Sequence, residues 1–158
     1  YGAEHPTPNL DRLAADGIRY ETAWSMLDGD LSHKALVFGR YPSRMTEEQP
    51  SFVKLLVEAG YERDDYDFDR EFELPDDRPF LLLCQLPPPN GNLAEHVTKV
   101  DELVGTLASY TAAENTFFLF TSSGGSAVGG KLSGESYPAG KGANADLGAH
   151  VPLSLIHI

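Results

Sequence analysis

The stretch PFLLLCQL (Pro79–Leu86) decides the fold class, together with TFFLFT (Thr116–Thr121) further along the chain. Both are continuous apolar runs of strand length, which is typical of strands in a sheet covered on two faces. Between them, apolar residues recur at steps of four, three, four and three, which predicts one helix with a single apolar stripe: Leu93, Val97, Val100, Val104 and Leu107. Strand, helix and strand predict a parallel pair joined by a right-handed crossover, and therefore an α/β fold.

The chain before this unit predicts three shorter helices and one strand. Pro8 after Thr7 is typical of a helix start, and Gly17 ends that helix before a strand over Ile18–Trp24. The further helices are expected over Ser32–Phe38 and Ser51–Ala59, each followed by a glycine.

Two segments are harder to assign. The acidic stretch Glu62–Arg78 has apolar residues at alternate positions, so it is either an acidic loop or an exposed edge strand. Its spacing Asp65, Asp67, Asp69 also imitates the start of a calcium loop, but Arg70 stands where that loop needs glycine, so a solvated charge run is preferred. Residues 122–148 are rich in Gly, Ser and Ala and predict one long loop.

Composition excludes several classes of function. The 158 residues contain 24 Asp and Glu against 12 Lys and Arg, for a net charge of −12, which disfavours binding to nucleic acid or to an anionic membrane surface. No apolar run is long enough for a membrane span, so we expect a soluble protein, and a high-salt source is one explanation of the acidic surface. The single cysteine, Cys84, is expected in the core.

Several motifs in order resemble the N-terminal domain of sulfatases, within the alkaline-phosphatase-like superfamily. The first two are TPNLDRLAADGIRYETAWS (Thr7–Ser25) and FGRYPSR (Phe38–Arg44). The later ones are LLVEAGY (Leu55–Tyr61), PFLLLCQLPPP (Pro79–Pro89), VDELVG (Val100–Gly105), NTFFLFTSSGG (Asn115–Gly125) and GKGANADLGAHVPL (Gly140–Leu153). The resemblance implies an alkaline-phosphatase-like sandwich, a mostly parallel mixed sheet with helices on both faces. The family pattern extends beyond Tyr1 and Ile158, so residues 1–158 are expected to be a partial domain, truncated at both ends.

The resemblance also implies hydrolysis of sulfate monoesters, or of phosphate esters in relatives. In the family, a formylglycine made from a cysteine attacks sulfur, but that position falls on Gly29 here, and glycine has no nucleophilic atom. Ser32 next to His33 is a candidate substitute for nucleophile and base. Sequence neighbours on a helix point about 100° apart, however, so the alternative is a helix-capping serine and a surface histidine.

The cofactor that the family implies is calcium, whose ligands are replaced in this chain. The positions of the family's Asp and its Asn or His are Ser123 and Gly124, and a family histidine corresponds to Pro88. The family's paired acids would precede Tyr1, so no metal site is predicted. Lys141 lies where the family has a sulfate-binding lysine, with an ordinary exposed lysine as the alternative.

The resulting hypothesis is a fragment of a sulfatase-family (sulfuric ester hydrolase) domain. It is expected to be catalytically inactive, because the nucleophile and metal-ligand positions are substituted. The alternatives are an active sulfate or phosphate ester hydrolase with a hydroxyl nucleophile, and an anion-binding or interaction module that holds such an ester; no protein partner is indicated. LSLIHI (Leu153–Ile158) also matches the translation of a transposon end used in sequencing-library preparation, so it is a candidate non-native scar, set aside from the fold prediction.

Overall fold

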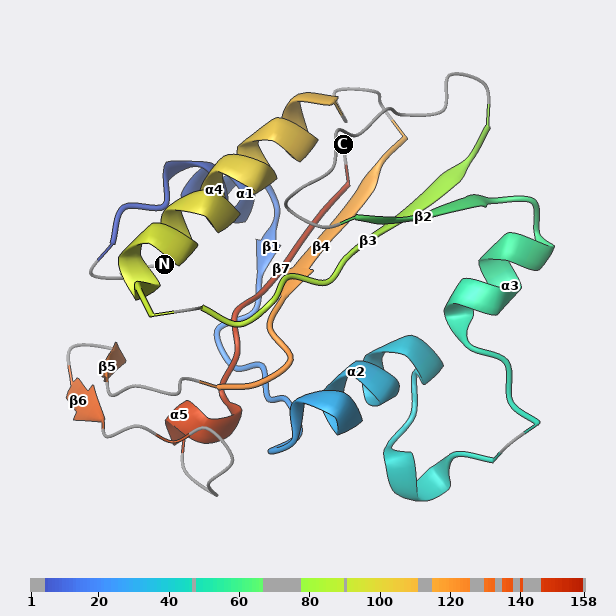
Figure 1. Ribbon diagram of the computed structural model, residues 1–158, viewed down its shortest axis with the longest axis horizontal. Helices are drawn as coiled ribbons and strands as arrows, with labels where there is room; N and C mark the ends of the chain where they lie inside the picture. The colour runs from blue at the N-terminus through green and yellow to red at the C-terminus, as the bar shows by residue number, and fades with distance from the viewer. Residues whose placement is uncertain are drawn as a thin grey trace. The chain divides into compact units, whose positions relative to one another are not determined.

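The computed structural model describes residues 5–46, 48–66, 78–89, 91–110, 115–125, 130–132, 135–137, 140 and 146–157 (Figure 1). The chain forms two compact units, of which the first combines Tyr1–Ser32 with Gly91–Ile158 and the second is His33–Asn90. Each unit has its own small sheet, and the architecture is α/β. Within the described ranges, no helix has the length and apolar character that crossing a membrane requires.

The sheet of the first unit has the strand order β1-β7-β4, with β1 at Ile18–Arg19, β7 at Leu153–His157 and β4 at Phe117–Thr121. Both pairings are antiparallel. The prediction of a mostly parallel sheet is therefore wrong for this sheet. The reason is β7, the segment set aside as a candidate scar, which lies in the centre and runs opposite to both neighbours.

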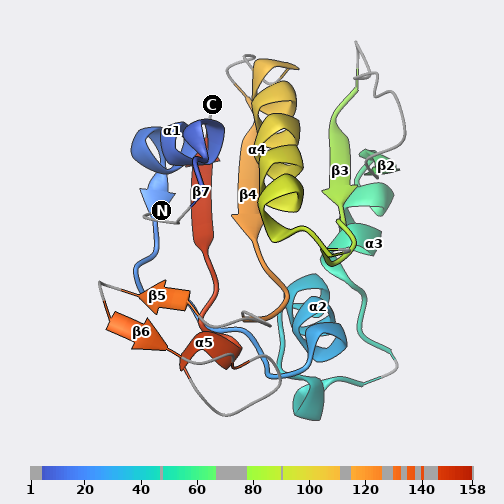
Figure 2. The same ribbon diagram turned by 60° about the vertical axis from the view of Figure 1, so that its left-hand side comes forward.

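One face of this sheet is packed and the other is open. The register places Ser154 beside Phe120, and the Ser154 residue is only 1% exposed. Helices α1 (Pro8–Asp16) and α4 (Leu93–Tyr110) lie together on one side of the sheet in Figures 1 and 2, and their buried apolar residues are Leu13, Leu103, Val104 and Leu107. The opposite set of large apolar side chains, Ile18, Phe117 and Leu119, is exposed. The core of this unit therefore lies between the two helices and the sheet.

A buried carboxylate joins α1 to α4. Asp101 is 4% exposed, and its Oδ1 accepts hydrogen bonds from the backbone N–H groups of Asn9, at 3.1 Å, and Leu10, at 2.9 Å. The Asn9 side-chain amide donates to Asp101 Oδ2 at 2.9 Å. The first amides of a helix have no partner within it, and Thr7 makes no side-chain bond to them here. Asp101, about 90 residues away in sequence, supplies the missing acceptors.

The second unit contains a parallel pair, but with a different partner from the one expected. Strand β3 (Phe80–Cys84) pairs in parallel with β2 (Glu62–Tyr66), whereas the sequence pattern predicted β4 as its partner. The short β2 comes from the acidic stretch, and residues 67–77 of that stretch, with two aspartates of the imitated calcium loop, lie outside the described residues. Helix α3 (Phe52–Glu58) precedes β2, and Ser51 Oγ caps it by accepting from the Lys54 N–H.

Cys84 ends β3 at an exposed position, so its expected place in the core is wrong. The thiol is nevertheless desolvated, and this burial, with the nearby Asp64 carboxylate, raises the pKa of Cys84 to about 11. Both causes disfavour the thiolate, so the cysteine is a weak nucleophile at neutral pH.

The remaining elements lie between β4 and β7 and in residues 18–44. Strands β5 (Gly130–Leu132) and β6 (Glu135–Tyr137) form an antiparallel pair, and α5 (Asp146–Ala149) is one helical turn, so the prediction of a single loop over 122–148 is wrong. Helix α2 (Gly29–Phe38) begins three residues before its expected start, and a 3-10 turn, η1 (Pro42–Arg44), follows it. The strand expected over Ile18–Trp24 is interrupted after Arg19 and resumes as an isolated bridge at Trp24.

Candidate functional site

Three segments of the first unit meet beyond the end of β4. The turn after β4 is joined to the segment before β7 by the hydrogen bond from Gly125 N to Gly148 O, at 3.1 Å. The segment before α2 is joined to it by Ser25 N, which donates to Ala149 O at 2.7 Å. Residues 25–29, 122–125 and 148–149 therefore form one locus, built from parts of the chain that are far apart in sequence.

This locus brings together two positions that the family resemblance marks as catalytic. A Cβ atom added to Gly29, the nucleophile position, would lie 3.5 Å from Ser123 Oγ, at a metal-ligand position. Asp28 precedes Gly29 and caps α2, because its Oδ1 accepts from the Leu31 N–H at 2.9 Å. The structure therefore brings these two positions close together, with a glycine at one and a serine at the other.

Ser32 and His33 are in different surroundings. Ser32 is buried, and its hydroxyl lies within hydrogen-bond distance of two backbone carbonyl oxygens, Met26 O at 3.1 Å and Asp28 O at 2.9 Å. His33 is exposed. Since a hydroxyl has one hydrogen, Ser32 donates to one of these carbonyls, both of which precede α2. A capping serine would instead accept from a backbone N–H, as Asp28 does here, so the interpretation of Ser32 as a helix cap is wrong.

The donors at the locus do not fit a calcium ion. Ser123 offers one neutral hydroxyl, Gly124 no side chain, and Asp28 the one carboxylate of the locus, already bonded to Leu31 N–H, whereas calcium takes six to eight oxygen ligands that usually include several carboxylates. Among the residues that the structure describes, no three His, Cys, Asp or Glu side chains are grouped closely enough to hold a metal ion. Pro88 belongs to the second unit, and Lys141 lies outside the described residues.

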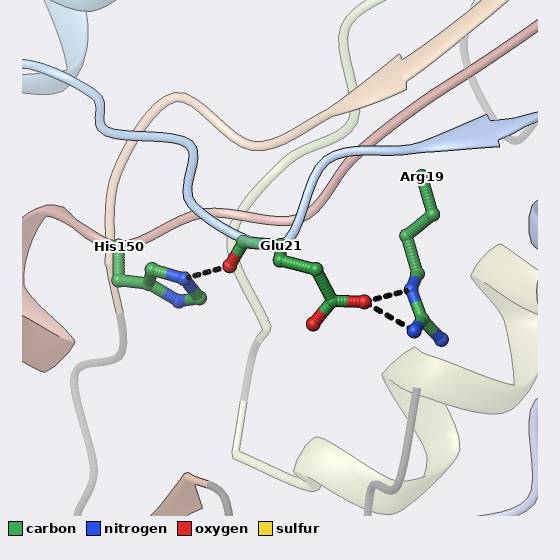
Figure 3. Close-up of polar contacts among 3 residues, drawn as sticks. All are labelled: Arg19, Glu21 and His150. Carbon is green, nitrogen blue, oxygen red and sulfur yellow. Dashed lines mark hydrogen bonds and ion pairs between the residues drawn. The ribbon is translucent and has the colours of Figure 1, made fainter.

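The structure adds a polar cluster that sequence reasoning missed (Figure 3). His150 Nε2 lies 3.0 Å from the backbone oxygen of Glu21, and the Arg19 guanidinium forms an ion pair with the Glu21 carboxylate. The His150 ring also contacts the Trp24 ring edge to face, with the centroids 5.5 Å apart. No spacing in the sequence signals this cluster, because residues 19–24 and His150 meet only when β1 and β7 pair.

The chain is similar to a known protein in its fold. No protein-family model and no curated protein sequence matches the chain. Among solved structures, the chain is similar to the PsFucS1 sulfatase from Pseudoalteromonas sp., with a TM-score of 0.75 and 18% sequence identity over 96% of this chain. The match covers 56% of that sulfatase, so this chain spans little more than half its length. At this identity the likeness concerns the fold: the chain has an α/β fold similar to that of a sulfatase.

Proposed function

We propose that this chain is a sulfatase-like domain fragment that does not hydrolyse sulfate esters as it stands. The observation that carries the proposal is the proximity of Gly29 to Ser123, whose Oγ would lie 3.5 Å from a Cβ atom added to Gly29. Two segments that the sequence resemblance assigned to one active site lie together, with a glycine and a serine in place of the nucleophile and the metal-binding carboxylate.

The chemistry of sulfuryl transfer explains why these replacements matter. The reaction needs an atom that attacks sulfur and positive charge that stabilises the oxygens of the transferred group. Gly29 has no such atom, and a neutral serine hydroxyl at position 123 cannot replace a carboxylate that holds a divalent cation. The simplest explanation is that this locus keeps the backbone of a sulfatase-like site without the side chains that the reaction needs.

The space around Gly29 supports the same proposal. Gly29 is the first residue of α2, and the nearest atom to an added Cβ is at ordinary van der Waals distance. Packing therefore does not require glycine here. The backbone at this position has room for the Cβ atom that any nucleophilic side chain would need.

The proposal is tested by incubating the purified chain with 4-nitrophenyl sulfate and with 4-nitrophenyl phosphate, with and without added calcium. We expect no release of nitrophenol above the buffer rate. Ser32→Ala and His33→Ala variants, purified in the same way, are assayed in parallel.

Saturable turnover that both variants lose would contradict the proposal and establish the hydroxyl nucleophile instead. Turnover that tracks the purified chain and survives in both variants would also contradict it, by showing that other residues perform the reaction.

A further inference from the structure

The pairing of the segment around β1 with the segment around β7 changes register once. In an antiparallel pair, the residue numbers of two opposite residues have a constant sum as long as the register is unchanged. Up to Tyr20 this sum is 173, as for Ile18 opposite Leu155, and Tyr20 N donates to Leu153 O at 2.9 Å. Beyond this point the sum is 174. The three contacts that show it are Val151 N to Ala23 O at 3.0 Å, the bridge between Trp24 and His150, and Ser25 N to Ala149 O.

Two residues, Glu21 and Thr22, therefore lie opposite the single residue Pro152. One extra residue on one strand of an antiparallel pair is a β-bulge, a feature that is frequent beside functional sites because it redirects the chain. The bulge explains why the strand expected over Ile18–Trp24 is interrupted. It ends three residues before Ser25, which joins the locus of Gly29 and Ser123.

The carbonyl group of Glu21, inside the bulge, receives its hydrogen bond from a side chain. His150 Nε2 is 3.0 Å from this oxygen, and since a carbonyl can only accept, the hydrogen of the imidazole is on Nε2. The side chain of Glu21 is also held in place, because Arg19 Nε donates to its carboxylate at 2.9 Å (Figure 3).

The same histidine ring restrains Trp24. The two rings are edge to face, with an interplanar angle of 79°, although Trp24 is 57% exposed. Such aromatic pairs have a preferred geometry, so the contact orients an indole that solvent alone would leave free to rotate.

We infer that His150 is a positioning residue for the candidate site. Its Nε2–H bond to Glu21 fixes the bulge, and its ring orients Trp24. These two contacts determine the backbone position at which Ser25 donates to Ala149. This inference concerns the geometry of the segment and holds whether or not the chain is catalytically active.

Substitutions at His150 separate the two contacts. His150→Ala removes both, His150→Gln keeps an N–H donor without the ring, and His150→Phe keeps a ring without the donor. His5→Ala, before α1, is the control. Amide hydrogen exchange is measured at Ser25 and Val151, beside the bulge, and at Leu10, whose amide is bound by Asp101. Near-ultraviolet circular dichroism reports Trp24, the single tryptophan of the chain.

For His150→Ala we expect exchange at Ser25 and Val151 to rise about fivefold to tenfold, as for the loss of one net hydrogen bond, with Leu10 unchanged. His150→Gln restores slow exchange to within about twofold but loses the tryptophan dichroism signal. His150→Phe keeps the signal and exchanges like alanine, and His5→Ala changes neither quantity. The inference is overturned if the Gln variant exchanges as fast as the Ala variant, or if Leu10 accelerates in parallel with Ser25.

Discussion

Two glycines in the first unit differ in how closely their surroundings approach them. A Cβ atom on Gly17, which follows α1, would lie 2.4 Å from the backbone oxygen of Leu155 and 2.9 Å from Ile156 Cβ. A Cβ atom on Gly29, at the candidate site, would meet nothing nearer than 3.5 Å. Packing requires the first glycine and does not require the second. The scaffold is thus tightly constrained where α1 meets β7 and open at the nucleophile position.

The contact between α1 and α4 is as closely packed as the surroundings of Gly17. A Cβ atom on Gly105 would lie 2.6 Å from the side chain of Asn9, which is itself hydrogen-bonded to the buried Asp101. The residues that hold the helices together leave no room for an added Cβ atom, whereas Gly29 at the candidate site does. Unfolding measurements test this difference between the two regions.

The largest effect is expected for Gly17→Ala. The new methyl group would collide with the backbone of β7, which cannot move without disturbing the central strand, so we expect a loss of about 3 kcal/mol in the free energy of unfolding. Urea denaturation followed by far-ultraviolet circular dichroism measures it. A loss below about 1 kcal/mol would show that α1 and β7 are not held this closely.

The next effect is expected for Asp101→Ala. It leaves the backbone N–H groups of Asn9 and Leu10 without their acceptor in a buried position, which costs about 2 kcal/mol of stability. The matched control is Glu102→Gln, at the exposed neighbouring position of α4, where the change should be within about 0.5 kcal/mol. Equal effects of the two substitutions would contradict the role of Asp101.

A smaller effect is expected for Gly105→Ala. Alanine favours the helix, but its methyl group displaces the Asn9 side chain from Asp101, so we expect a net loss of about 1 kcal/mol. In an Asn9→Ala background the collision is gone and the same substitution should be neutral or stabilising. A double-mutant cycle by urea denaturation measures this coupling, and simple additivity would refute it.

The smallest effect is expected for Gly29→Ala. The methyl group has room beside Ser123, and alanine is the better helix former, so stability should change by less than about 0.5 kcal/mol or rise slightly. The measurement is the same urea titration, with Gly17→Ala as the opposite extreme. A large loss would mean that packing, after all, requires glycine at the nucleophile position.

Sequence patterns predicted the helices well because each has a local signal. The stripe of α4 follows the helical period, Pro8 starts α1, and Gly17 ends it. The strand partners were predicted poorly, because an apolar strand such as Phe80–Cys84 carries no mark of which neighbour it pairs with. For the candidate site, the resemblance pointed to Gly29 and Ser123, which the structure brings close together, whereas the contribution of His150 depends on a register that no local pattern encodes.

The sequence by itself determined the α/β class and most helices, because period, capping residues and motif order are local properties. The tertiary structure alone decided the antiparallel sheet around β7, the capping of α1 by Asp101 and the bulge held by His150. Each of these depends on hydrogen bonds between residues at least 32 positions apart, which is the separation of Thr121 and Leu153. Such bonds form only when the segments pack, so they leave no trace in the spacing of neighbouring residues.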